Sequence, residues 1–159
     1  MNFIEHAYQD ENQNPPILRF KKLFPNAAEP VRGTKFSAGL DLSACVSDAV
    51  GIPPRDTVKI GTGLSFEIPH GYFGAVFARS GLASKHGLRP ANCVGVIDED
   101  YRGEVIVAMH NDSDTWQTIT PGERIAQLVL IPYLNPPCLE CQDLDKTERG
   151  EGGFGSTGV

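Results

Sequence analysis

Residues 149–159 combine side chains that can bind an anion with one that can cover a flat ring. The segment consists mostly of Gly, Ser and Thr, with Arg149 at its start and Phe154 inside it. Closely spaced glycines allow successive backbone N–H groups to converge on an anion. The Arg149 guanidinium and the hydroxyls of Ser156 and Thr157 add further donors. The segment can therefore hold a polyphosphate and cover an aromatic base; the alternative is a glycine-rich tail that binds nothing.

A second group of anion-binding side chains lies at Arg79-Ser80-Gly81. Residues 80–86 form the one short stretch that reads as a helix, beginning at the capping residue Ser80 and ending before Gly87. Helix N-termini bind phosphates because their free N–H groups and the helix dipole face the anion. A phosphate site is one interpretation of this group, and a plain serine cap beside a surface arginine is the other.

The acidic turn within residues 95–103 (Gly-Val-Ile-Asp-Glu-Asp-Tyr-Arg-Gly) places Asp98 at the end of an apolar strand. A carboxylate at that position can orient a water molecule. Tyr101 follows three residues later and can face the same pocket. The alternative interpretation is a tight β-turn whose acidic side chains are simply solvated.

Asp41 is a carboxylate within the otherwise apolar strand pattern of residues 39–45. Because burying an unpaired carboxylate costs several kcal/mol, it requires a partner, either a structural arginine or a hydrated metal ion. Arg124 and Gln127 interrupt another apolar run. Gln127 is either a core amide satisfied by the backbone or a ligand contact, and Arg124 is either structural or ligand-binding.

Further strand patterns surround these candidates, and Gly or Pro bounds most of them. The patterns predict strands at residues 17–23, 39–45, 57–61, 63–68, 72–78, 93–97, 104–109 and 124–131, with a loop at 25–35. Many short strands with almost no helix indicate an all-β jelly roll or distorted β-barrel. One short helix and a C-terminal Gly-rich arm complete the expected fold.

Length and charge limit the class of protein. The 159 residues suit one domain, and the 17 Gly and 12 Pro fit short strands and turns better than helices. The net charge of −6 argues against a nucleic-acid coat protein, which needs a basic face, but not against a small anionic ligand. No apolar run is long enough to span a membrane, and residues 1–16 lack the pattern of a signal peptide. We therefore expect neither a nucleic-acid partner nor a membrane partner.

The cysteines do not form the pattern of a structural metal site. Only Cys138 and Cys141 have metal-like spacing, whereas Cys45 and Cys93 lie far apart and no histidine pair completes a site. We interpret all of them as free thiols, which is typical of a reducing compartment and predicts a cytoplasmic location.

Five segments, taken in order, resemble the motifs of the trimeric dUTPase family. They are 38–42 (AGLDL), 79–82 (RSGL), 95–103, 124–128 (RIAQL) and 149–158, and the resemblance spans residues 17–158. It implies a jelly-roll subunit and a homotrimer with active sites at the subunit interfaces. The chain then divides into a flexible N-terminal arm (1–16), a β-barrel domain (17–135), and a linker with a nucleotide-covering tail (136–159).

The resemblance implies hydrolysis of dUTP to dUMP and pyrophosphate with Mg²⁺, which limits uracil in DNA and supplies dUMP for thymidylate synthesis. Asp98 then positions and deprotonates the water that attacks the α-phosphorus, and it also holds the sugar 3′-hydroxyl. Tyr101 stacks beneath the deoxyribose and leaves no room for a 2′-hydroxyl. Asp41 faces the hydrated Mg²⁺ through water.

The same resemblance assigns the substrate contacts. Those to the phosphates fall to Arg79, Ser80, Gly81 and Gln127, and those to the uracil edge fall to Asn92 and the backbone of Gly95 and Val96. A neighbouring subunit delivers the tail, whose substrate contacts are Arg149, Ser156 and Thr157 on the γ-phosphate, Phe154 over the uracil ring, and Gly155.

Two other functions remain open at this stage. A dCTP deaminase of the same superfamily, alone or bifunctional, should lack the acidic turn with its tyrosine and use a different general base, typically a glutamate. A non-catalytic regulatory module would keep the fold and bind dUTP or a protein partner. Asp98, Tyr101 and the complete tail favour the hydrolase.

Overall fold

The computed structural model describes residues 16–153, and this part of the chain is nearly all β. Among these residues there is one helix, α1 (Ser80–His86). The strands are β1 (Arg19–Lys22), β2 (Val31–Arg32), β3 (Leu40–Ser43), β4 (Val50–Ile52), β5 (Thr57–Gly61), β6 (Leu64–Glu67), β7 (Tyr72–Ala78), β8 (Leu88–Pro90), β9 (Val94–Ile97), β10 (Ile106–Asn111), β11 (Gln117–Ile119) and β12 (Arg124–Pro132).

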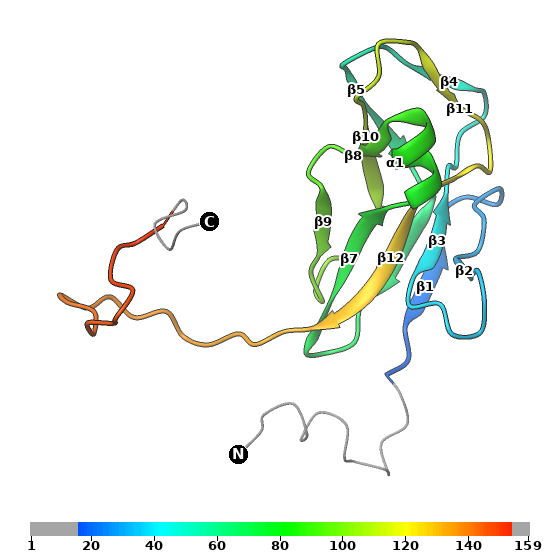
Figure 1. Cartoon of the computed structure of the whole chain (residues 1–159). Coiled ribbons are helices and arrows are strands. Elements are labelled where there is room, and N and C mark those ends of the chain that lie inside the picture. The colour runs from blue at the N-terminus through cyan, green and yellow to red at the C-terminus, as the bar shows by residue number, and fades with distance from the viewer. Residues whose placement is uncertain (1–15, 154–159) are drawn as a thin grey trace.

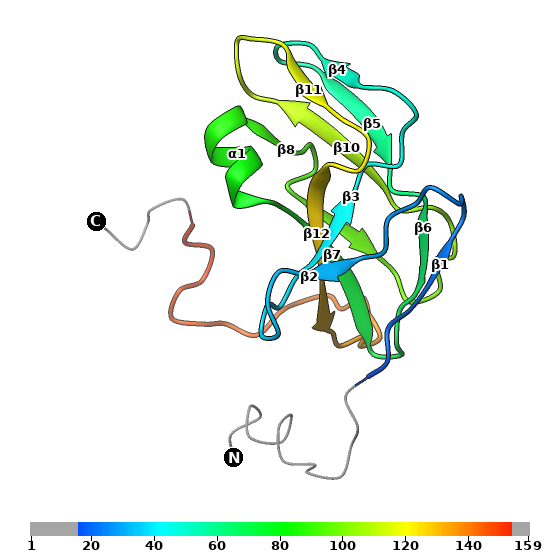
Figure 2. The same cartoon turned by 90° about the vertical axis from the view of Figure 1, so that its right-hand side faces the viewer.

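The strands form one large sheet and three small ones, and their pairings are antiparallel (Figure 1, Figure 2). The large sheet has the order β2-β3-β12-β7-β9, and a three-stranded sheet has the order β5-β10-β8. Two-stranded sheets pair β1 with β6 and β11 with β4. None of these described sheets closes on itself, so the core lies between sheets and not inside a closed barrel.

Strand β12 runs through the centre of the large sheet, between β3 and β7. Its side chains alternate between two faces, so Leu128 is buried whereas Gln127 lies on the opposite face and is half-buried. The core lies beneath the face of the large sheet that carries Leu128, and all of the sheets contribute side chains to it. The largest fully buried side chains there are Phe66, Leu42, Ile52, Ile60, Leu64, Leu88, Met109, Ile119, Ile125 and Leu128.

The opposite face of the large sheet, which we call the outer face, is also apolar. Along β7 and β12 its side chains are Phe73, Phe77, Val129 and Ile131, all of them half-buried. On the edge strand β9, Val96 points to the same side and is 61% exposed. A contiguous, partly exposed apolar surface of this kind marks an interaction site.

All eight predicted strands are present, with ends that differ by at most two residues. The sequence does not predict β2, β4, β8 or β11, and β2 lies inside the expected loop at residues 25–35. Each of these strands has only two or three residues, which is too short a run to show alternation. They exist because a longer strand pairs with them or because they pair with each other.

Helix α1 has the predicted bounds, but the prediction that Ser80 caps it is wrong. Arg79 is the N-cap residue, with an extended backbone (φ −85°, ψ 130°), and no side chain in the described part of the chain caps the helix. Ser80 is already helical, and its carbonyl accepts a hydrogen bond from the Ser84 hydroxyl (2.7 Å). Gly87 ends the helix as predicted, in the left-handed conformation (φ 65°).

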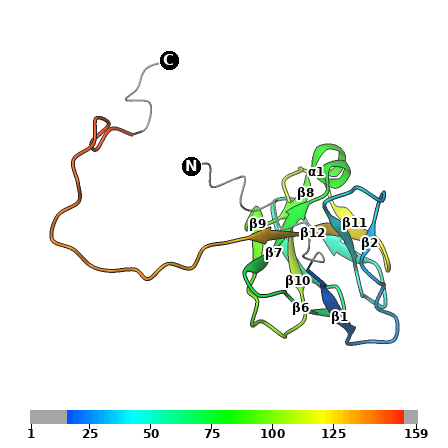
Figure 3. The ribbon, with the colours of Figure 1, turned by 90° about the horizontal axis from the view of Figure 1, so that it is seen from below.

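Beyond β12, residues 133–153 contain no helix or strand and run away from the sheets (Figure 1, Figure 3). We call this stretch the arm. Its first residue is attached to the body, because the Tyr133 N–H donates to the Gly71 carbonyl (3.1 Å) and the Tyr133 ring meets Phe73 edge-on. The tail residues singled out from the sequence that lie outside the described residues are Phe154, Gly155, Ser156 and Thr157.

The side chains of the cysteines are unpaired, as expected from the sequence. Cys45 is half-buried, and Cys93, Cys138 and Cys141 are exposed. Among residues 16–153 no helix has the length and apolar character needed to cross a membrane. The cytoplasmic location stays a prediction.

Candidate active site

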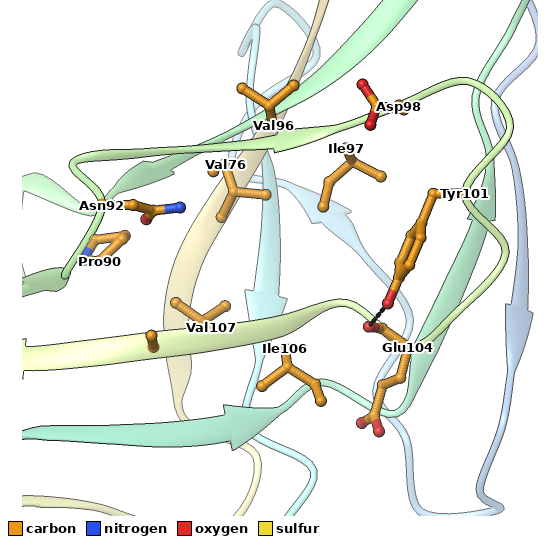
Figure 4. A pocket seen from close by; sticks show the side chains of 12 residues that line it. Val76, Pro90, Asn92, Val96, Ile97, Asp98, Tyr101, Glu104, Ile106 and Val107 are labelled. Atoms are coloured by element: carbon orange, nitrogen blue, oxygen red, sulfur yellow. Dashed lines mark hydrogen bonds between the residues drawn. The ribbon is translucent and has the colours of Figure 1, made fainter.

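A cavity of about 310 Å³ opens between strands β9 and β10 (Figure 4). Its volume lies within the range of small-molecule sites. The lining comes mainly from β9, β10 and the turns at the two ends of β9, with Val76 of β7 and Pro90 of β8. We call this space the β9 cavity. The residues from the sequence analysis that meet there are Asn92, Gly95, Val96, Asp98 and Tyr101.

The turn before β9 presents Asn92 at one end of the cavity (Figure 4). The Val94 N–H donates to the Asn92 carbonyl (2.6 Å), and the Cys93 N–H donates to the Pro90 carbonyl (3.1 Å). Cys93 has a φ of 62°, in the left-handed region that costs a non-glycine residue about 1 kcal/mol or more. A backbone of this kind persists only where its surroundings hold it.

Arg89 supplies that support. Its guanidinium donates to the Asp112 carboxylate through Nε (2.6 Å) and Nη2 (3.1 Å). Nη1 donates to the carbonyls of Pro90 (3.2 Å) and Ala91 (3.4 Å). The hydrogen bond from Arg89 lowers the pKa of Asp112, and the same bond raises the pKa of Arg89, so both groups stay charged. The bidentate ion pair between Arg89 and Asp112, at the end of β10, thus holds the turn that carries Asn92.

Gly95 keeps the middle of the cavity open. It pairs with Val76 of β7, and a Cβ at position 95 would lie 3.2 Å from the Val76 Cβ and 3.6 Å from the Asn92 amide nitrogen. A side chain there would fill the space beside Asn92. Because β9 is the edge strand of the large sheet, the backbone groups along its free edge are available to a ligand.

Tyr101 closes the other end of the cavity. Its hydroxyl donates to the backbone carbonyl of Glu104 (3.0 Å) (Figure 4). The ring lies over Gly103, where a Cβ would collide with it. Glu104 is fixed in turn, because its Oε1 accepts the Gly63 N–H (2.8 Å). Tyr101 is 43% exposed, so an aromatic side chain with a fixed position remains accessible to a ligand.

Asp98 lies at the rim of the cavity, on the same side of β9 as Val96, and Ile97 lies on the other side (Figure 4). Its backbone carbonyl accepts the Tyr101 N–H (3.2 Å), which closes the turn. The residue is exposed, and no hydrogen bond or ion pair engages its carboxylate within residues 16–153. The carboxylate can therefore accept a hydrogen bond from water.

A second cavity, of about 560 Å³, lies on the other side of Asp98. Its lining includes Phe73 and Val96 of the outer face, together with Tyr133 and Asn135 at the beginning of the arm. Asp98 borders both cavities. Its carboxylate therefore stands where the β9 cavity meets the outer face and the arm.

Asp41, Arg79 and Arg124 form a separate group, which we call the arginine cluster. Oδ1 of Asp41 accepts Nε of Arg79 (2.9 Å), and Oδ2 accepts Nη1 of Arg124 (3.0 Å). The Asp41 side chain is only 13% exposed, and a carboxylate buried to this extent requires a partner. In the structure this partner is a pair of arginines. Two guanidinium groups against one carboxylate leave an excess positive charge, and each arginine keeps further N–H groups that can bind an anion.

Gln127 and the start of α1 flank the arginine cluster. Gln127 pairs with Asp41 across β12 and β3, and its amide nitrogen donates to the Ala78 carbonyl (2.9 Å). The backbone therefore satisfies its donor. Ser80 and Gly81 begin the helix directly after Arg79, and a Cβ added to Gly81 would meet nothing within 4 Å. The first turn of α1 is thus open to a ligand.

The structure brings the predicted site residues together in two places. Neither cavity is lined by the arginine cluster, Gln127 or the first turn of α1. Arg149 lies in the arm, where its Nε donates to the Gly152 carbonyl (2.8 Å). Within the described residues, those predicted to contact the uracil edge, the sugar and the water share one cavity, and those predicted to contact phosphates lie outside it.

Sequence reasoning misses the residues that support the β9 cavity, namely Arg89, Asp112 and Glu104. Arg89 is 23 residues from its partner Asp112, and Glu104 is 41 residues from Gly63. No local pattern marks pairs at such separations. The nearest signal is the position of Arg89 and Glu104 on either side of the stretch that contains Asn92 and Asp98.

The side chains within residues 16–153 include no group of three or more His, Cys, Asp or Glu that could hold a metal ion. Each oxygen of Asp41 accepts one arginine N–H and retains a lone pair, so it can accept a further hydrogen bond from a metal-bound water. Mg²⁺ retains several waters and takes phosphate oxygens as ligands. The carboxylate oxygens of Asp41 therefore fit a hydrated ion that arrives with a polyphosphate.

A model of the dUTPase family matches residues 26–158 of the chain. The deoxyuridine 5′-triphosphate nucleotidohydrolase of Oryza sativa subsp. japonica is 48% identical over 144 residues, which are 91% of this chain and 82% of the relative. The protein of the same name from Desulfitobacterium hafniense (strain DSM 10664 / DCB-2) is 51% identical over 131 residues, which are 82% of this chain and 87% of the relative.

Solved structures show the same likeness. The dUTPase of Staphylococcus bacteriophage 80alpha with dUPNHPP has a TM-score of 0.81 at 32% identity, covering 91% of this chain and 100% of that one. A mutant dUTPase from phage phi11 of S. aureus, in which a structural Mg(II) ion is coordinated, has a TM-score of 0.74 at 25% identity, covering 82% and 100%. The predicted all-β jelly roll is confirmed by this likeness.

Proposed function

The chain belongs to the dUTPase family and is a dUTP diphosphatase, and on this premise we propose that a water held by Asp98 attacks the α-phosphorus of dUTP. The products are dUMP and pyrophosphate. The observation that carries the proposal is the β9 cavity, in which one short stretch of chain places an amide, an aromatic ring and an exposed carboxylate around one space. We propose that the cellular role is to limit uracil in DNA and to supply dUMP for thymidylate synthesis.

The end of the cavity near Asn92 suits the base. Uracil presents donors and acceptors along one edge, and the Asn92 amide with the free backbone groups of Gly95 and Val96 can match them. The Arg89 ion pair keeps the turn before β9 from moving, which favours a single donor and acceptor pattern. We propose that a ring held closely against β9 leaves no space for a 5-methyl group, so we expect dTTP to be excluded.

The end near Tyr101 suits the sugar. The aromatic ring is fixed by its hydroxyl bond to Glu104 and by contact with Gly103. A deoxyribose stacked on this ring would bring its C2′ close to the ring face. A 2′-hydroxyl at that position would lose its hydration without gaining a partner, which disfavours UTP.

Asp98 lies beyond the sugar end and acts as the general base. It accepts a proton from the water as the water oxygen forms its bond to the α-phosphorus, and the bond from that phosphorus to the bridging oxygen of pyrophosphate breaks. It also holds the 3′-hydroxyl, which sets the distance between carboxylate and phosphate. No covalent nucleophile is required, because this chemistry depends on positioning and on neutralising charge.

The arginine cluster supplies positive charge for the phosphates. We assign phosphate contacts to Arg79, to the first turn of α1 at Ser80 and Gly81, and to Gln127. Arg149, Ser156 and Thr157 of the tail add donors at the γ-phosphate, while Phe154 with Gly155 covers the uracil ring. Asp41 would contact a triphosphate-bound Mg²⁺ through water, and the ion would neutralise further charge on the phosphates. Arg124 completes the ion pair with Asp41 and is assigned a structural role.

We propose a homotrimer in which each site is shared between subunits. The apolar outer face supports association, since Phe73, Phe77 and Val96 stay partly exposed in a single chain. The separation of the β9 cavity from the arginine cluster also supports it, because neighbouring copies can place one group opposite the other. We also propose that the chain divides into an N-terminal arm (1–16), a domain (17–135) and a linker with tail (136–159). The tail would cover an active site on another copy.

The decisive experiment measures pyrophosphate release from dUTP, dTTP, dCTP and UTP, with and without EDTA. We expect turnover of dUTP alone and its loss with EDTA. Ammonia release from dCTP would instead indicate a deaminase, and dUTP binding without turnover would indicate a regulatory module. The relatives described above carry the name of the hydrolase, which disfavours both alternatives.

A further inference from the structure

The side chain of Glu99 connects the turn after β9 to a second turn that lies far away in the sequence. Its Oε2 accepts the Gly71 N–H (2.9 Å), and its Oε1 contacts Nδ1 of His70 (3.1 Å). His70 and Gly71 form the turn between β6 and β7, 28 or 29 residues before Glu99. One carboxylate therefore joins two turns at the same edge of the molecule.

The backbone of Glu99 is held as well. Its carbonyl accepts Nη1 of Arg102 (2.6 Å), a bond made within the turn itself. Farther along the turn, the Ser65 hydroxyl donates to the Arg102 carbonyl (2.7 Å). Asp98 thus lies between the end of the β9–β7 pairing, where Ile97 pairs with Gly74, and the attachment made by the Glu99 carboxylate. Ser65 attaches the far half of the turn.

We infer that Glu99 is a positioning residue, whose carboxylate holds the adjacent Asp98 at the rim of the β9 cavity by tying its turn to the turn at His70 and Gly71. The inference rests on the proposed role of Asp98 as general base. It assigns Glu99 no contact with the substrate.

The charge of Glu99 matches this task. The hydrogen bond from the Gly71 N–H lowers the pKa of its carboxyl, and the contact with His70 lowers it further, so Glu99 is ionised at neutral pH. Hydrogen bonds to an ionised acceptor are shorter and stronger than neutral ones. Gly71 has a φ of 78°, a conformation suited to glycine, and in this turn its N–H points at the carboxylate.

The same contacts reach the beginning of the arm. The Gly71 carbonyl accepts the Tyr133 N–H (3.1 Å), and the Gly71 N–H donates to the Glu99 carboxylate. A single residue therefore binds both the beginning of the arm and Glu99. Loss of surrounding water raises the pKa of the Tyr133 hydroxyl, and the negative charge of Glu99 raises it further. Asp98, the β6–β7 turn and the start of the arm therefore form one connected unit.

The test compares Glu99→Ala with Asp100→Ala, which removes the same charge from the next residue of the same exposed turn. In Glu99→Ala the turn loses both bonds, and an ångström of displacement at a reacting group costs rate steeply, so we expect kcat to fall about tenfold with KM within about threefold. Asp100→Ala is expected to keep kcat within about twofold. Thermal unfolding of each variant accompanies the kinetics, which are measured well below the melting temperature.

Glu99→Gln adds a graded measurement and remains informative if Glu99→Ala does not fold. Its amide oxygen can accept the Gly71 N–H, but a neutral acceptor forms a weaker hydrogen bond than a carboxylate. We therefore expect kcat between those of the wild type and Glu99→Ala, or about threefold below the wild type. A role in stability alone would lower the melting temperature while leaving kcat unchanged, which is a different result.

An active wild type whose kcat survives unchanged in Glu99→Ala or Glu99→Gln would overturn the inference. An equal loss of kcat in Asp100→Ala would also overturn it. The negative charge of the turn, and not the contacts of Glu99, would then be responsible for the loss. Absence of dUTP turnover in the wild type is a separate outcome that refutes the proposed function itself.

Discussion

The β9 cavity and the arginine cluster are built in different ways. The cavity walls that carry Asn92, Asp98 and Tyr101 come from one short stretch of chain, shaped by hydrogen bonds to backbone groups and by glycine. The arginine cluster joins three segments, since Asp41 lies 38 residues from Arg79 and 83 from Arg124. Its charged groups pair with one another, whereas Asp98 makes no such pair within the described residues.

The difference reflects what each region has to recognise. Shape and neutral hydrogen bonds select a base and a sugar, so a cavity for them can be complete before the ligand arrives. Charge selects phosphates, and two guanidinium groups side by side repel each other when nothing compensates them. Asp41 compensates them and keeps both in place, while their remaining N–H groups stay available.

The largest expected effect is at the rim of the cavity. Asp98→Asn keeps the size of the side chain but cannot take a proton from water, so we expect kcat to fall by about 10³-fold. Binding of a non-hydrolysable dUTP analogue should stay within about threefold of the wild type, because its other contacts are intact. Single-turnover kinetics and calorimetry measure the two quantities. Turnover near the wild-type rate would mean that Asp98 is not the general base and that the β9 cavity only binds the substrate.

The next effect concerns the tail, which belongs to neither region. Deletion of residues 149–159 should lower kcat on the order of 100-fold, because donors to the γ-phosphate are lost and water enters the site. The assembly and its melting temperature should not change, since the core side chains of the described residues all precede this segment. Size-exclusion chromatography and thermal unfolding check this point. A truncated protein that unfolds or dissociates would contradict it.

Arg79→Ala tests whether the arginine cluster acts on phosphates alone. Loss of a charged hydrogen-bond donor should reduce kcat/KM for dUTP about 30-fold, with a smaller effect on inhibition by dUMP, which has fewer phosphates. Arg55→Ala is the matched control, because Arg55 also pairs with an aspartate, Asp114 (2.8 Å), outside both regions. Equal losses for dUTP and dUMP would show that the cluster does not recognise the outer phosphates.

The smallest effect is expected at the sugar end of the cavity. Tyr101→Ala removes the ring and should reduce the preference for dUTP over UTP about tenfold, measured as the ratio of kcat/KM values. Tyr101→Phe keeps the ring and loses only the bond to Glu104, so it should retain most of the preference. An unchanged ratio in Tyr101→Ala would place sugar selection outside the cavity.

The comparison also explains which features were predictable from the sequence. The strands with long alternating patterns could be identified because these patterns are local in the chain. The acidic turn with Asp98 and Tyr101 is local as well, whereas Asn92 is indicated only by the resemblance to the family. The support from Arg89 and Asp112 depends on the register that pairs Leu88 with Asn111, which tertiary packing sets and no local pattern reveals. The sequence also predicts the wrong cap for α1, because Ser80 has the residue type of a cap but the chain enters the helix one residue earlier, at Arg79.

The arm has a consequence for how the protein can be inactivated. Lys146 and Arg149 lie in it with exposed side chains, on a backbone that no strand or helix protects up to residue 153. Segments of this kind are preferred sites of proteolytic cleavage. A single cut by a trypsin-like protease would release residues 147–159 or 150–159 and leave every described strand in place. Limited digestion would then yield a folded fragment with a much lower kcat. Loss of activity by cleavage could therefore be distinguished from loss of activity by unfolding.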